Sequence, residues 1–288
     1  MESGVRNDRM KLGKLTPGKL AVKLIILLAV CLFLLVIIMP YVFMLLTSFR
    51  ATSEIVQNPG RIAPIKWTMS GYITVLTKSP YLKWFLNSVI VTVSVTLAVL
   101  FTSSITGFIF AKYNFKGKDI LFWIILATMM VPFAVTMILG FLVVNELGMY
   151  NTLWALIVPS FISGFGIFLC RQFCAEIPGE LCEAAKIDGA SDMSIYLRII
   201  LPPLRPCLGA LAIFTYLEKW NDYLGPLLML DSVENMTLPL SLSYFSSQHY
   251  NDFGAVMAAS ALIMIPVTAV FILLQKQFIK GIAITGMK

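Results

Sequence analysis

The sequence has few of the residues from which catalytic and metal sites are usually built. It contains a single histidine, His249, and charged residues make up 13% of the chain, against roughly 25% in an average soluble domain. Neither a nucleophile paired with a base nor a cluster of metal ligands is visible along it. We therefore predict no catalytic residue, no metal site and no enzymatic activity in this chain.

The glycine-rich loop that cradles nucleotide phosphates is also absent. The pattern G-x-x-x-x-G-K-[ST] occurs nowhere in the sequence. We expect this chain to bind no cofactor itself. Any step that consumes ATP with magnesium would have to take place on a separate chain.

The cysteines do not have the pattern of a disulfide framework. There are five of them, an odd number without paired spacing. Cys170 and Cys174 are one helical turn apart, a spacing that two metal ligands can use. Because there is one histidine and no other nearby thiol pair, packing in an apolar core is the favoured interpretation.

Long apolar runs make up most of the chain. Hydrophobic residues account for 58% of it, and the mean hydropathy is +0.85. A membrane-spanning helix needs about 20 apolar residues, so a chain of 288 residues has room for about six. We predict an all-α integral membrane protein with spans at about 24–46, 89–111, 120–144, 152–170, 204–230 and 253–274.

The segment before the first apolar run is polar and basic. The run itself has 23 residues without a charge, which corresponds to roughly 34 Å of helix. It is too long for the core of a signal peptide, and no small-residue cleavage site follows it. We predict a cytoplasmic N-terminal segment, 1–23, and a transmembrane domain, 24–288, that begins with an uncleaved anchor.

Polar and helix-breaking residues refine the other spans. Asn87 and Ser88 are good helix-start residues and precede the second span. Pro132 and Gly140 lie inside the third span, where they mark either kinks that line a path or, as favoured here, sites of close helix packing.

Basic residues predict the orientation of the chain in the membrane. Sixteen of the 22 Lys and Arg fall in the N-terminal segment, the loop after the second span, the loop after the fourth span and the C-terminal tail. Five fall on the opposite side, all in the first loop, and Lys219 is the remaining one. Since basic loops stay in the cytoplasm, both termini and the loop after the fourth span are predicted to be cytoplasmic.

That cytoplasmic loop, 175–203, is the longest charged segment between the apolar runs. It reads as a short helix over 179–187, a break at Asp188-Gly189, and a second helix capped by Ser191. Three prolines are expected to stop the second helix, and its predicted apolar stripe consists of Met193, Tyr196, Leu197, Ile200 and Leu201. Without further information, the two helices could also form an amphipathic hairpin that rests on the lipid surface.

The loop resembles the EAA loop of permease subunits of ATP-binding-cassette (ABC) importers, the binding-protein-dependent transport inner membrane components. The resemblance covers nearly the whole chain and is nearest to sugar-type permeases like the smaller permease of the maltose system. The loop residues that match are Glu183, Ala184, Ala185, Asp188, Gly189, Ile199, Leu201 and Pro202. Further matching stretches are 107–112, 115–117, 130–132, 151–156, 220–224, 237–240 and 277–281.

This resemblance implies a fold, partners and a transport activity. The fold would be the type I importer fold, with six helices and a cytoplasmic coupling loop between the fourth and fifth. The partners would be a second homologous permease, two ATPase subunits that dock on the Glu183 loop, and an extracytoplasmic solute-binding protein. The chain would then import a mono- or oligosaccharide across a bacterial cytoplasmic membrane, with no nucleic acid involved.

The fifth span carries charges, which are costly in a membrane and usually functional. Glu218 and Asp222 would share one helix face, while Lys219 would be displaced by about 100° and pair only by snorkelling or with a neighbouring helix. Either the segment lines a wet path with aromatic rings stacking on sugars, or it lies at the outer interface beyond a span that ends near residue 216. The candidate path residues are Tyr216, Glu218, Trp220, Asn221, Asp222 and Tyr223.

Three alternatives to sugar import remain open from the sequence. The same architecture could import another polar solute, or the chain could be a stand-alone channel or secondary carrier. An intramembrane enzyme is a weaker alternative. No internal repeat is visible, which disfavours a secondary carrier because many such folds are built from repeated halves.

Overall fold

The computed structural model describes residues 17–247 and 250–285, and most of these are helical. Within them, five helical segments are long and apolar enough to cross a membrane, or six if one bent pair counts as a single span. The predicted all-α membrane fold is therefore confirmed. The helices of the five segments are α1 (Pro17–Thr47), α4 (Tyr81–Lys112), α7 (Trp154–Ile157) with η1 (Val158–Ser160) and α8 (Gly164–Glu176), α10 (Asp192–Ile195) with η2 (Tyr196–Ile200) and α11 (Leu201–Trp220), and α14 (Phe253–Thr285).

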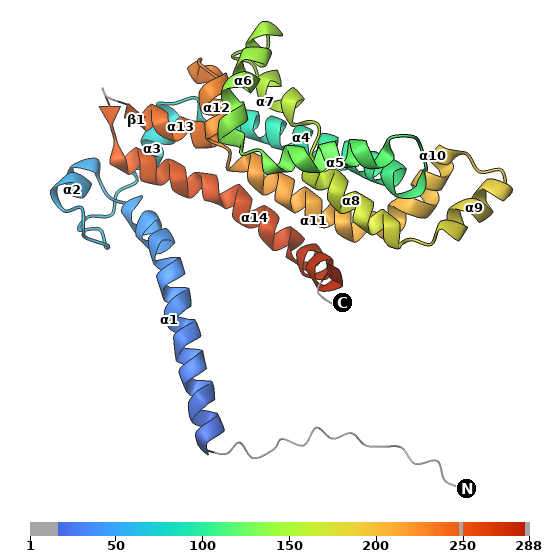
Figure 1. Cartoon of the computed structure of the whole chain (residues 1–288). Helices are drawn as coiled ribbons and strands as arrows, with labels where there is room; N and C mark the ends of the chain where they lie inside the picture. Colours follow the sequence, from blue (N-terminus) through green and yellow to red (C-terminus); the bar gives the residue numbers. More distant parts are fainter. Residues whose placement is uncertain (1–16, 248–249, 286–288) are drawn as a thin grey trace.

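The body of the molecule is a helical bundle. Helices α4, α8 and α11 pack on one another, and α14 lies along α11 (Figure 1). Helix α4 comes very close to α8 at Gly107, where an added Cβ would lie 2.6 Å from the Cβ of Cys170. Small residues at such crossings let membrane helices approach closely, as the sequence suggested for glycines within spans.

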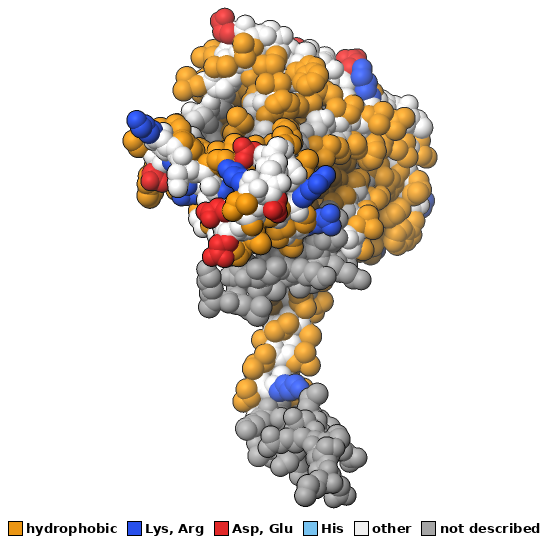
Figure 2. Space-filling view, turned by 90° about the vertical axis from the view of Figure 1, so that its right-hand side faces the viewer, with side chains coloured by type: hydrophobic (Ala, Val, Ile, Leu, Met, Phe, Trp, Pro, Cys, Tyr) orange, Lys and Arg blue, Asp and Glu red, His pale blue; other side chains and the backbone are white. Residues whose placement is uncertain are grey.

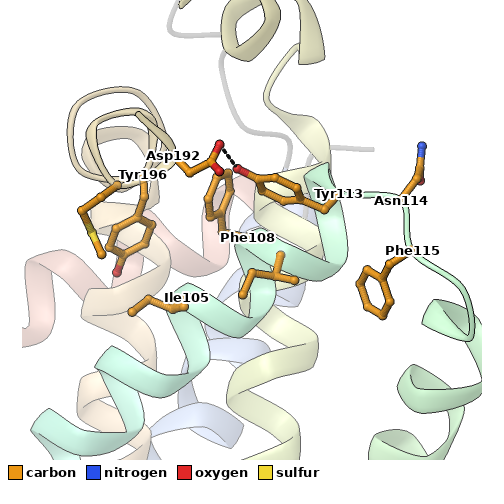
Figure 3. Close-up of a pocket in the computed structure, with 9 residues that line it drawn as sticks. Ile105, Phe108, Tyr113, Asn114, Phe115, Asp192 and Tyr196 are labelled. Atoms are coloured by element: carbon orange, nitrogen blue, oxygen red, sulfur yellow. Dashed lines mark hydrogen bonds between the residues drawn. The ribbon is translucent and has the colours of Figure 1, made fainter. Parts of the chain in front are cut away.

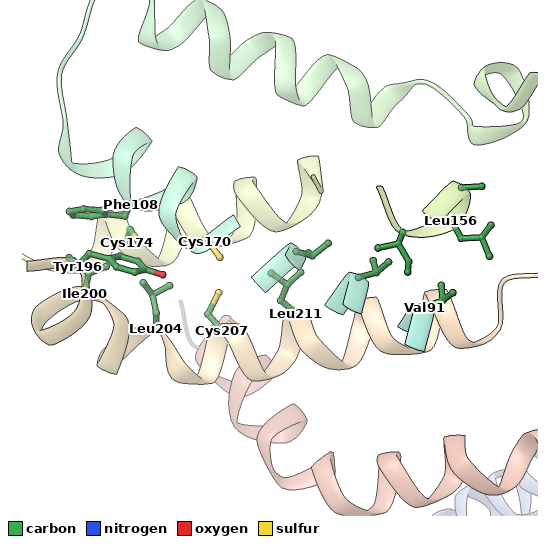
Figure 4. Close-up of a cluster of buried hydrophobic side chains, with 14 of the residues drawn as sticks. Val91, Phe108, Leu156, Cys170, Cys174, Tyr196, Ile200, Leu204, Cys207 and Leu211 are labelled. Atoms are coloured by element: carbon green, nitrogen blue, oxygen red, sulfur yellow. The ribbon is translucent and has the colours of Figure 1, made fainter. Parts of the chain in front are cut away.

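The core of the bundle is apolar and extends along its length. Ile200, Leu204 and Leu211 of the η2–α11 segment are buried against side chains of α4 and α8 (Figure 4). Cys170 and Cys174 of α8 are free thiols buried in the same cluster. Both thiols therefore pack in the core of this structure, the interpretation favoured because the sequence has one histidine and no other nearby thiol pair.

The bundle has two distinct ends. One end carries α9 (Gly179–Ile187) and α10, and is called the α9 end (Figure 1). The other, called the α13 end, carries short elements that connect the long helices. These are α2 (Thr52–Gln57), α3 (Ser70–Thr77), α12 (Leu224–Met229), η3 (Val233–Asn235), α13 (Leu238–Phe245), and a hairpin of β1 (Ser246–Ser247) and β2 (Tyr250–Asn251), paired antiparallel with Ser246 opposite Asn251.

The first loop, 47–86 in the sequence prediction, is folded. The guanidinium group of Arg50 is fully buried; its Nε donates to Glu54 Oε1 at 2.9 Å and its two Nη atoms donate to carbonyl oxygens of Asn58 and Arg61 at 2.9 and 2.8 Å. A buried charge is tolerated only when it is paired and hydrogen-bonded in this way. Arg50 therefore fixes α2 and the segment that follows it.

The third predicted span, 120–144, is not one straight helix. It is broken into α5 (Lys118–Met130) and α6 (Phe133–Glu146), whose axes differ by 104°. Val131 is extended, with φ −85° and ψ 117°, because the ring of Pro132 disfavours helical backbone at the residue before it. The proline thus breaks the segment, whereas the sequence analysis favoured a packing role.

The second span begins earlier than predicted. Helix α4 starts at Tyr81, so Asn87 and Ser88 lie inside it and do not start it. Asn87 Nδ2 donates to the carbonyl oxygens of Glu234 and Met236 at 2.9 Å, and Ser88 Oγ accepts from the backbone N–H of Leu238 at 2.8 Å. From within α4, these two side chains therefore hydrogen-bond to the backbone of η3, of the linker after it and of the start of α13.

The fifth span also differs from its prediction, 204–230. Helix continues from Asp192 to Trp220 through a π-helical segment, η2, so the second half of the predicted coupling loop, 175–203, belongs to this span. Pro202 and Pro203 do not stop the helix: they directly follow the π-helical segment η2, and the helix continues through them as α11. Pro206 is accommodated inside α11.

The first and last helices extend beyond their predicted bounds. Helix α1 begins at Pro17 and diverges from the bundle (Figure 1). An 18-residue apolar stretch within it has no buried residue. Helix α14 continues through most of the predicted tail, 275–288, as far as Thr285. Most of the predicted N-terminal segment, residues 1–16, and His249 lie outside the described residues.

Candidate functional site

Helix α9 and the turn after it form the tip of the α9 end. The helix has Glu180 in its first turn and Lys186 in its last, which places both charges favourably in the helix dipole. It ends at Gly189, which adopts φ +80°, and the N–H of Ala190 donates to the carbonyl oxygen of Ala185 at 2.9 Å. This is the left-handed helix ending that glycine favours, so the predicted break at Asp188-Gly189 is confirmed.

Helix α9 has one face on the bundle and one in solution. Cys182 is buried in the core, and Ala185 packs against it. Glu183 and Ala184 are exposed, and Ile187 is 87% exposed. The free face therefore combines a carboxylate with an apolar side chain, which suits contact with another protein.

Charged side chains gather around this tip. Figure 2 shows the α9 end with acidic and basic side chains clustered in the middle and hydrophobic side chains around them. Asp188 and Gly189 at the turn are both exposed. Of the remaining predicted loop residues, Pro202 is exposed, whereas Ile199 and Leu201 are partly buried against the core and support the loop from behind.

The predicted start of the second loop helix is confirmed. Ser191 is its N-cap, and its Oγ accepts from the N–H of Ser194 at 3.3 Å. The predicted apolar stripe is partly wrong, because Met193 and Leu197 are exposed while Tyr196 is buried. The buried stripe runs through Ile195 instead, since the π-helical turn rotates the positions that face α4 and α8.

A polar cluster that the sequence did not indicate joins α10 to the end of α4. Tyr113, the residue after α4, donates its hydroxyl hydrogen to Asp192 Oδ1 at 2.5 Å (Figure 3). Lys186 Nζ lies 3.5 Å from the same oxygen and 4.8 Å from the centre of the Tyr113 ring. A mostly apolar cavity of about 460 Å³ opens beside the cluster and is lined by Ile105, Phe108, Ile109, Tyr113, Asn114, Phe115, Asp192, Met193 and Tyr196.

Two of the predicted path residues pack inside the protein. Trp220 is 1% exposed, and its ring stacks on that of Tyr216, with centroids 5.6 Å apart and an interplanar angle of 14°. Its indole N–H donates to the carbonyl oxygen of Ile263 at 3.3 Å. Stacking of Trp220 on a sugar, one of the two alternatives left open by the sequence, does not fit this conformation, because other side chains cover the faces of its ring.

The other path residues lie around the end of α11. The helix ends at Trp220, so Glu218 and Asp222 do not share a helix face as predicted. Glu218 is exposed and pairs with its neighbour Lys219 at 3.1 Å, a pairing that the predicted angular offset had disfavoured but that flexible side chains allow. Asp222 Oδ1 accepts from the N–H of Gly225 at 3.1 Å and caps the start of α12.

Asn221 and Tyr223 remain accessible. Tyr223 is partly exposed, and Asn221 donates its amide hydrogen to the carbonyl oxygen of Leu217 at 2.8 Å. Asn221 also lines a cavity of about 400 Å³ between α1, the end of α11 and α14, together with Tyr41, Ile263, Met264, Val267 and Thr268. Asn221 is thus the predicted path residue that borders this cavity, whose other lining residues are mostly apolar.

Asn151 is a second feature that the sequence analysis did not single out as a site. It adopts φ +56°, rare for a residue other than glycine, and its Oδ1 accepts from the N–H groups of Asp231 and Ser232 at 3.0 Å. The hydroxyl of Ser232 and the amide of Asn235 also donate to this side chain. The only sequence signal was the position of Asn151 in one of the family-like stretches.

Comparison with known proteins finds similarity to membrane components of transport systems. Residues 103–284 match the family model described as "Binding-protein-dependent transport system inner membrane component". The arabinooligosaccharides transport system permease protein AraQ of Halalkalibacterium halodurans is 33% identical over 87% of this chain and 91% of its own length. The diacetylchitobiose uptake system permease protein NgcG of Streptomyces coelicolor is 31% identical over 84% and 81%. The lactose transport system permease protein LacG of Rhizobium radiobacter is 31% identical over 85% and 89%.

A solved structure has a similar fold. It is a chain of a bacterial ABC transporter involved in the import of the acidic polysaccharide alginate, with a TM-score of 0.79. The likeness covers 91% of this chain and 98% of the other, at 22% sequence identity. The two chains therefore share their helical arrangement over the part that is covered.

Proposed function

This chain belongs to the family of binding-protein-dependent transport system inner membrane components, and we propose that it is the permease subunit of an ABC importer for oligosaccharides. The observation that carries the proposal is similarity to carbohydrate permeases over more than four fifths of the chain. Arabinooligosaccharides, diacetylchitobiose and lactose are the solutes named for these relatives. They share a ring with many hydroxyl groups, so an oligosaccharide is the substrate class proposed here.

In this proposal the α9 end receives a separate ATPase. The free face of α9 supports it, because Glu183 and the highly exposed Ile187 project from a tip that is surrounded by charge. An apolar side chain held out on a short helix fits a groove, and the carboxylate would pair with a basic residue at its rim. ATP with magnesium would then act on the partner, and closure of two ATPase subunits would move α9.

The second permease subunit and the solute-binding protein are further proposed partners. Helix α1 contacts α14, but the apolar side chains along most of its length are exposed, and we propose that these contact lipid or another membrane chain. The α13 end would face the outside and receive the solute-binding protein. With α9 in the cytoplasm, both termini are proposed to be cytoplasmic.

The test is uptake by a reconstituted complex. The tagged chain is purified from its host in mild detergent, co-purifying chains are identified by mass spectrometry, and the complex is placed in liposomes with its solute-binding protein. We expect a second permease and an ATPase to co-purify, and radiolabelled arabinooligosaccharide to accumulate only with ATP on the α9 side.

Two results would contradict the proposal. Uptake by the purified single chain without ATP would show a stand-alone carrier or channel. ATP-dependent uptake of amino acids or other polar solutes, with no carbohydrate transported or bound by the solute-binding protein, would support an importer but contradict an oligosaccharide substrate.

A further inference from the structure

Three separate elements meet at the base of α9. Tyr113 follows α4, Lys186 is in the last turn of α9, and Asp192 begins α10. Asp192 Oδ1 accepts from the Tyr113 hydroxyl at 2.5 Å and lies 3.5 Å from Lys186 Nζ. A single carboxylate oxygen thus links the tip to the loop that follows α4 (Figure 3).

The backbone on either side of α9 does not by itself fix its angle on the bundle. Pro178 precedes the helix, and Gly189 ends it in a left-handed turn around which an added Cβ would meet no atom within 4 Å. The apolar contacts of α9 come from small side chains, Cys182 and Ala185. In the part of the chain that is described, the Lys186–Asp192 pair is the only salt bridge between α9 and another element.

On the other side, Tyr113 is connected to the buried face of α4. Its ring packs edge-on against Phe108, with centroids 5.3 Å apart, and Phe108 contacts the ring of Tyr196 at 5.8 Å. The Tyr196 hydroxyl in turn shares a buried hydrogen bond of 2.7 Å with Ser104 of α4. Displacement of Asp192 would therefore reach α4 through a continuous set of packed and hydrogen-bonded groups.

The cavity beside Tyr113 leaves one side of its ring without packing. The contacts with Phe108 and Lys186 hold the rest of the ring, and the hydrogen bond to Asp192 is what joins the phenol to α10. Burial, followed by the neighbouring Asp192, raises the pKa of Tyr113 to about 12, so the phenol stays protonated and able to donate at physiological pH.

We propose that Tyr113 is a positioning residue for energy coupling, which holds α9 at a fixed angle to the bundle through its hydrogen bond to Asp192. Movement of α9 by a docked ATPase would then pass to α4 directly as well as along α10 and η2 to α11. This inference rests on the proposed function, since it assigns a role within the coupling of ATP hydrolysis to transport.

The test is the variant Tyr113→Phe in the reconstituted complex. It keeps the ring, its contact with Phe108 and its position beside Lys186, and removes only the hydroxyl. We expect the number of ATP molecules hydrolysed per solute imported to rise about fivefold, the lower end of typical coupling between sites. The KM for the solute should be unchanged, because the residue lies at the end opposite Asn221. Tyr150→Phe, which removes a tyrosine hydroxyl at the α13 end, is the matched control and should behave as wild type.

A double-variant cycle makes the test specific. Asp192→Ala removes both contacts of the carboxylate, so it should raise the ratio at least as much as Tyr113→Phe. The double variant Tyr113→Phe/Asp192→Ala should be no worse than Asp192→Ala alone, because the hydroxyl then has no acceptor left to lose. Additive effects, or an unchanged ratio in Tyr113→Phe, would overturn the role, as would a change confined to KM. If the wild-type complex itself imports solute without ATP, that result contradicts the proposed function as well as this inference.

Discussion

At the scale of single residues, Asn151 shows how one side chain organises the α13 end. Its Oδ1 accepts hydrogen bonds from groups 80 to 84 residues further along the chain, so it ties the turn before α7 to the segment before η3. Asparagine suits this position, because it tolerates the left-handed conformation and supplies an acceptor at the same time.

We expect Asn151→Ala to destabilise the protein. It leaves two backbone N–H groups without their acceptor. It also places alanine at φ +56°, a left-handed conformation that alanine tolerates less well than asparagine. Together these changes should cost about 3 kcal/mol. In thermal unfolding in mild detergent, followed by circular dichroism, this corresponds to a melting temperature lower by roughly 6–12 °C.

Asn151→Gly separates the two causes, because glycine relieves the backbone strain and also lacks the acceptor. It should be destabilised by about 1 kcal/mol less than the alanine variant. Melting of both variants at the wild-type temperature would mean that these hydrogen bonds do not hold the two segments together.

At the scale of elements, α9 is a short helix that is anchored on one face and free on the other. Its burial through Cys182 and Ala185 uses small side chains, so the helix lies close to the bundle while Glu183 and Ile187 stay in solution. A charge reversal on the free face should therefore affect a partner far more than the fold of this chain.

We expect Glu183→Lys to leave membrane insertion and folding intact but to separate ATP hydrolysis from transport. The lysine would face the basic partner residue that the proposed docking requires, and like charges at an interface repel. The measurement is uptake together with ATPase activity in the reconstituted complex. Glu146→Lys makes the same charge change at an exposed position at the end of α6 and is the control. Wild-type transport by the Glu183 variant would argue against docking at α9.

At the scale of the whole molecule, the distribution of basic residues and the two ends of the bundle indicate the same orientation in the membrane. Lys186 is in the last turn of α9, Lys112 ends α4 and Arg198 lies in η2 just after α10, all on the side that the count of basic residues assigns to the cytoplasm. The α13 end holds the first loop, in which a buried Arg50 is neutralised by Glu54 and so serves the fold.

We expect an impermeant maleimide to distinguish the two ends. In intact cells it should label Lys78→Cys, exposed after α3, and not Glu180→Cys, exposed on α9; in inverted vesicles the pattern should reverse. The chain is expressed alone, with Cys31→Ser as the parent, because the other cysteines are buried. Labelling of Glu180→Cys from outside would overturn the orientation and with it the proposed docking side.

The sequence predicted features that depend on composition and on neighbouring residues. Apolar length gave the membrane class, Ser191 and Gly189 gave the start and end of the loop helices, and the EAA-like loop pointed to the family. Predictions about prolines were wrong in both directions. Pro132 breaks a span that was expected to be continuous, and Pro202 lies within a continuous helix that it was expected to stop.

The sequence by itself determined that this chain crosses a membrane several times, that it has a charged loop whose first helix ends at a glycine, and that it contains no G-x-x-x-x-G-K-[ST] pattern. Each of these follows from local pattern, since the bilayer selects apolar length and a turn selects its own residues. Only the tertiary structure decided that Trp220 is covered by neighbouring side chains, that Asn151 joins two distant segments, and that Tyr113 meets Asp192, 79 residues away. Those contacts depend on which helices lie side by side, and a side chain's partner across a bundle leaves no periodic signal in the sequence around it.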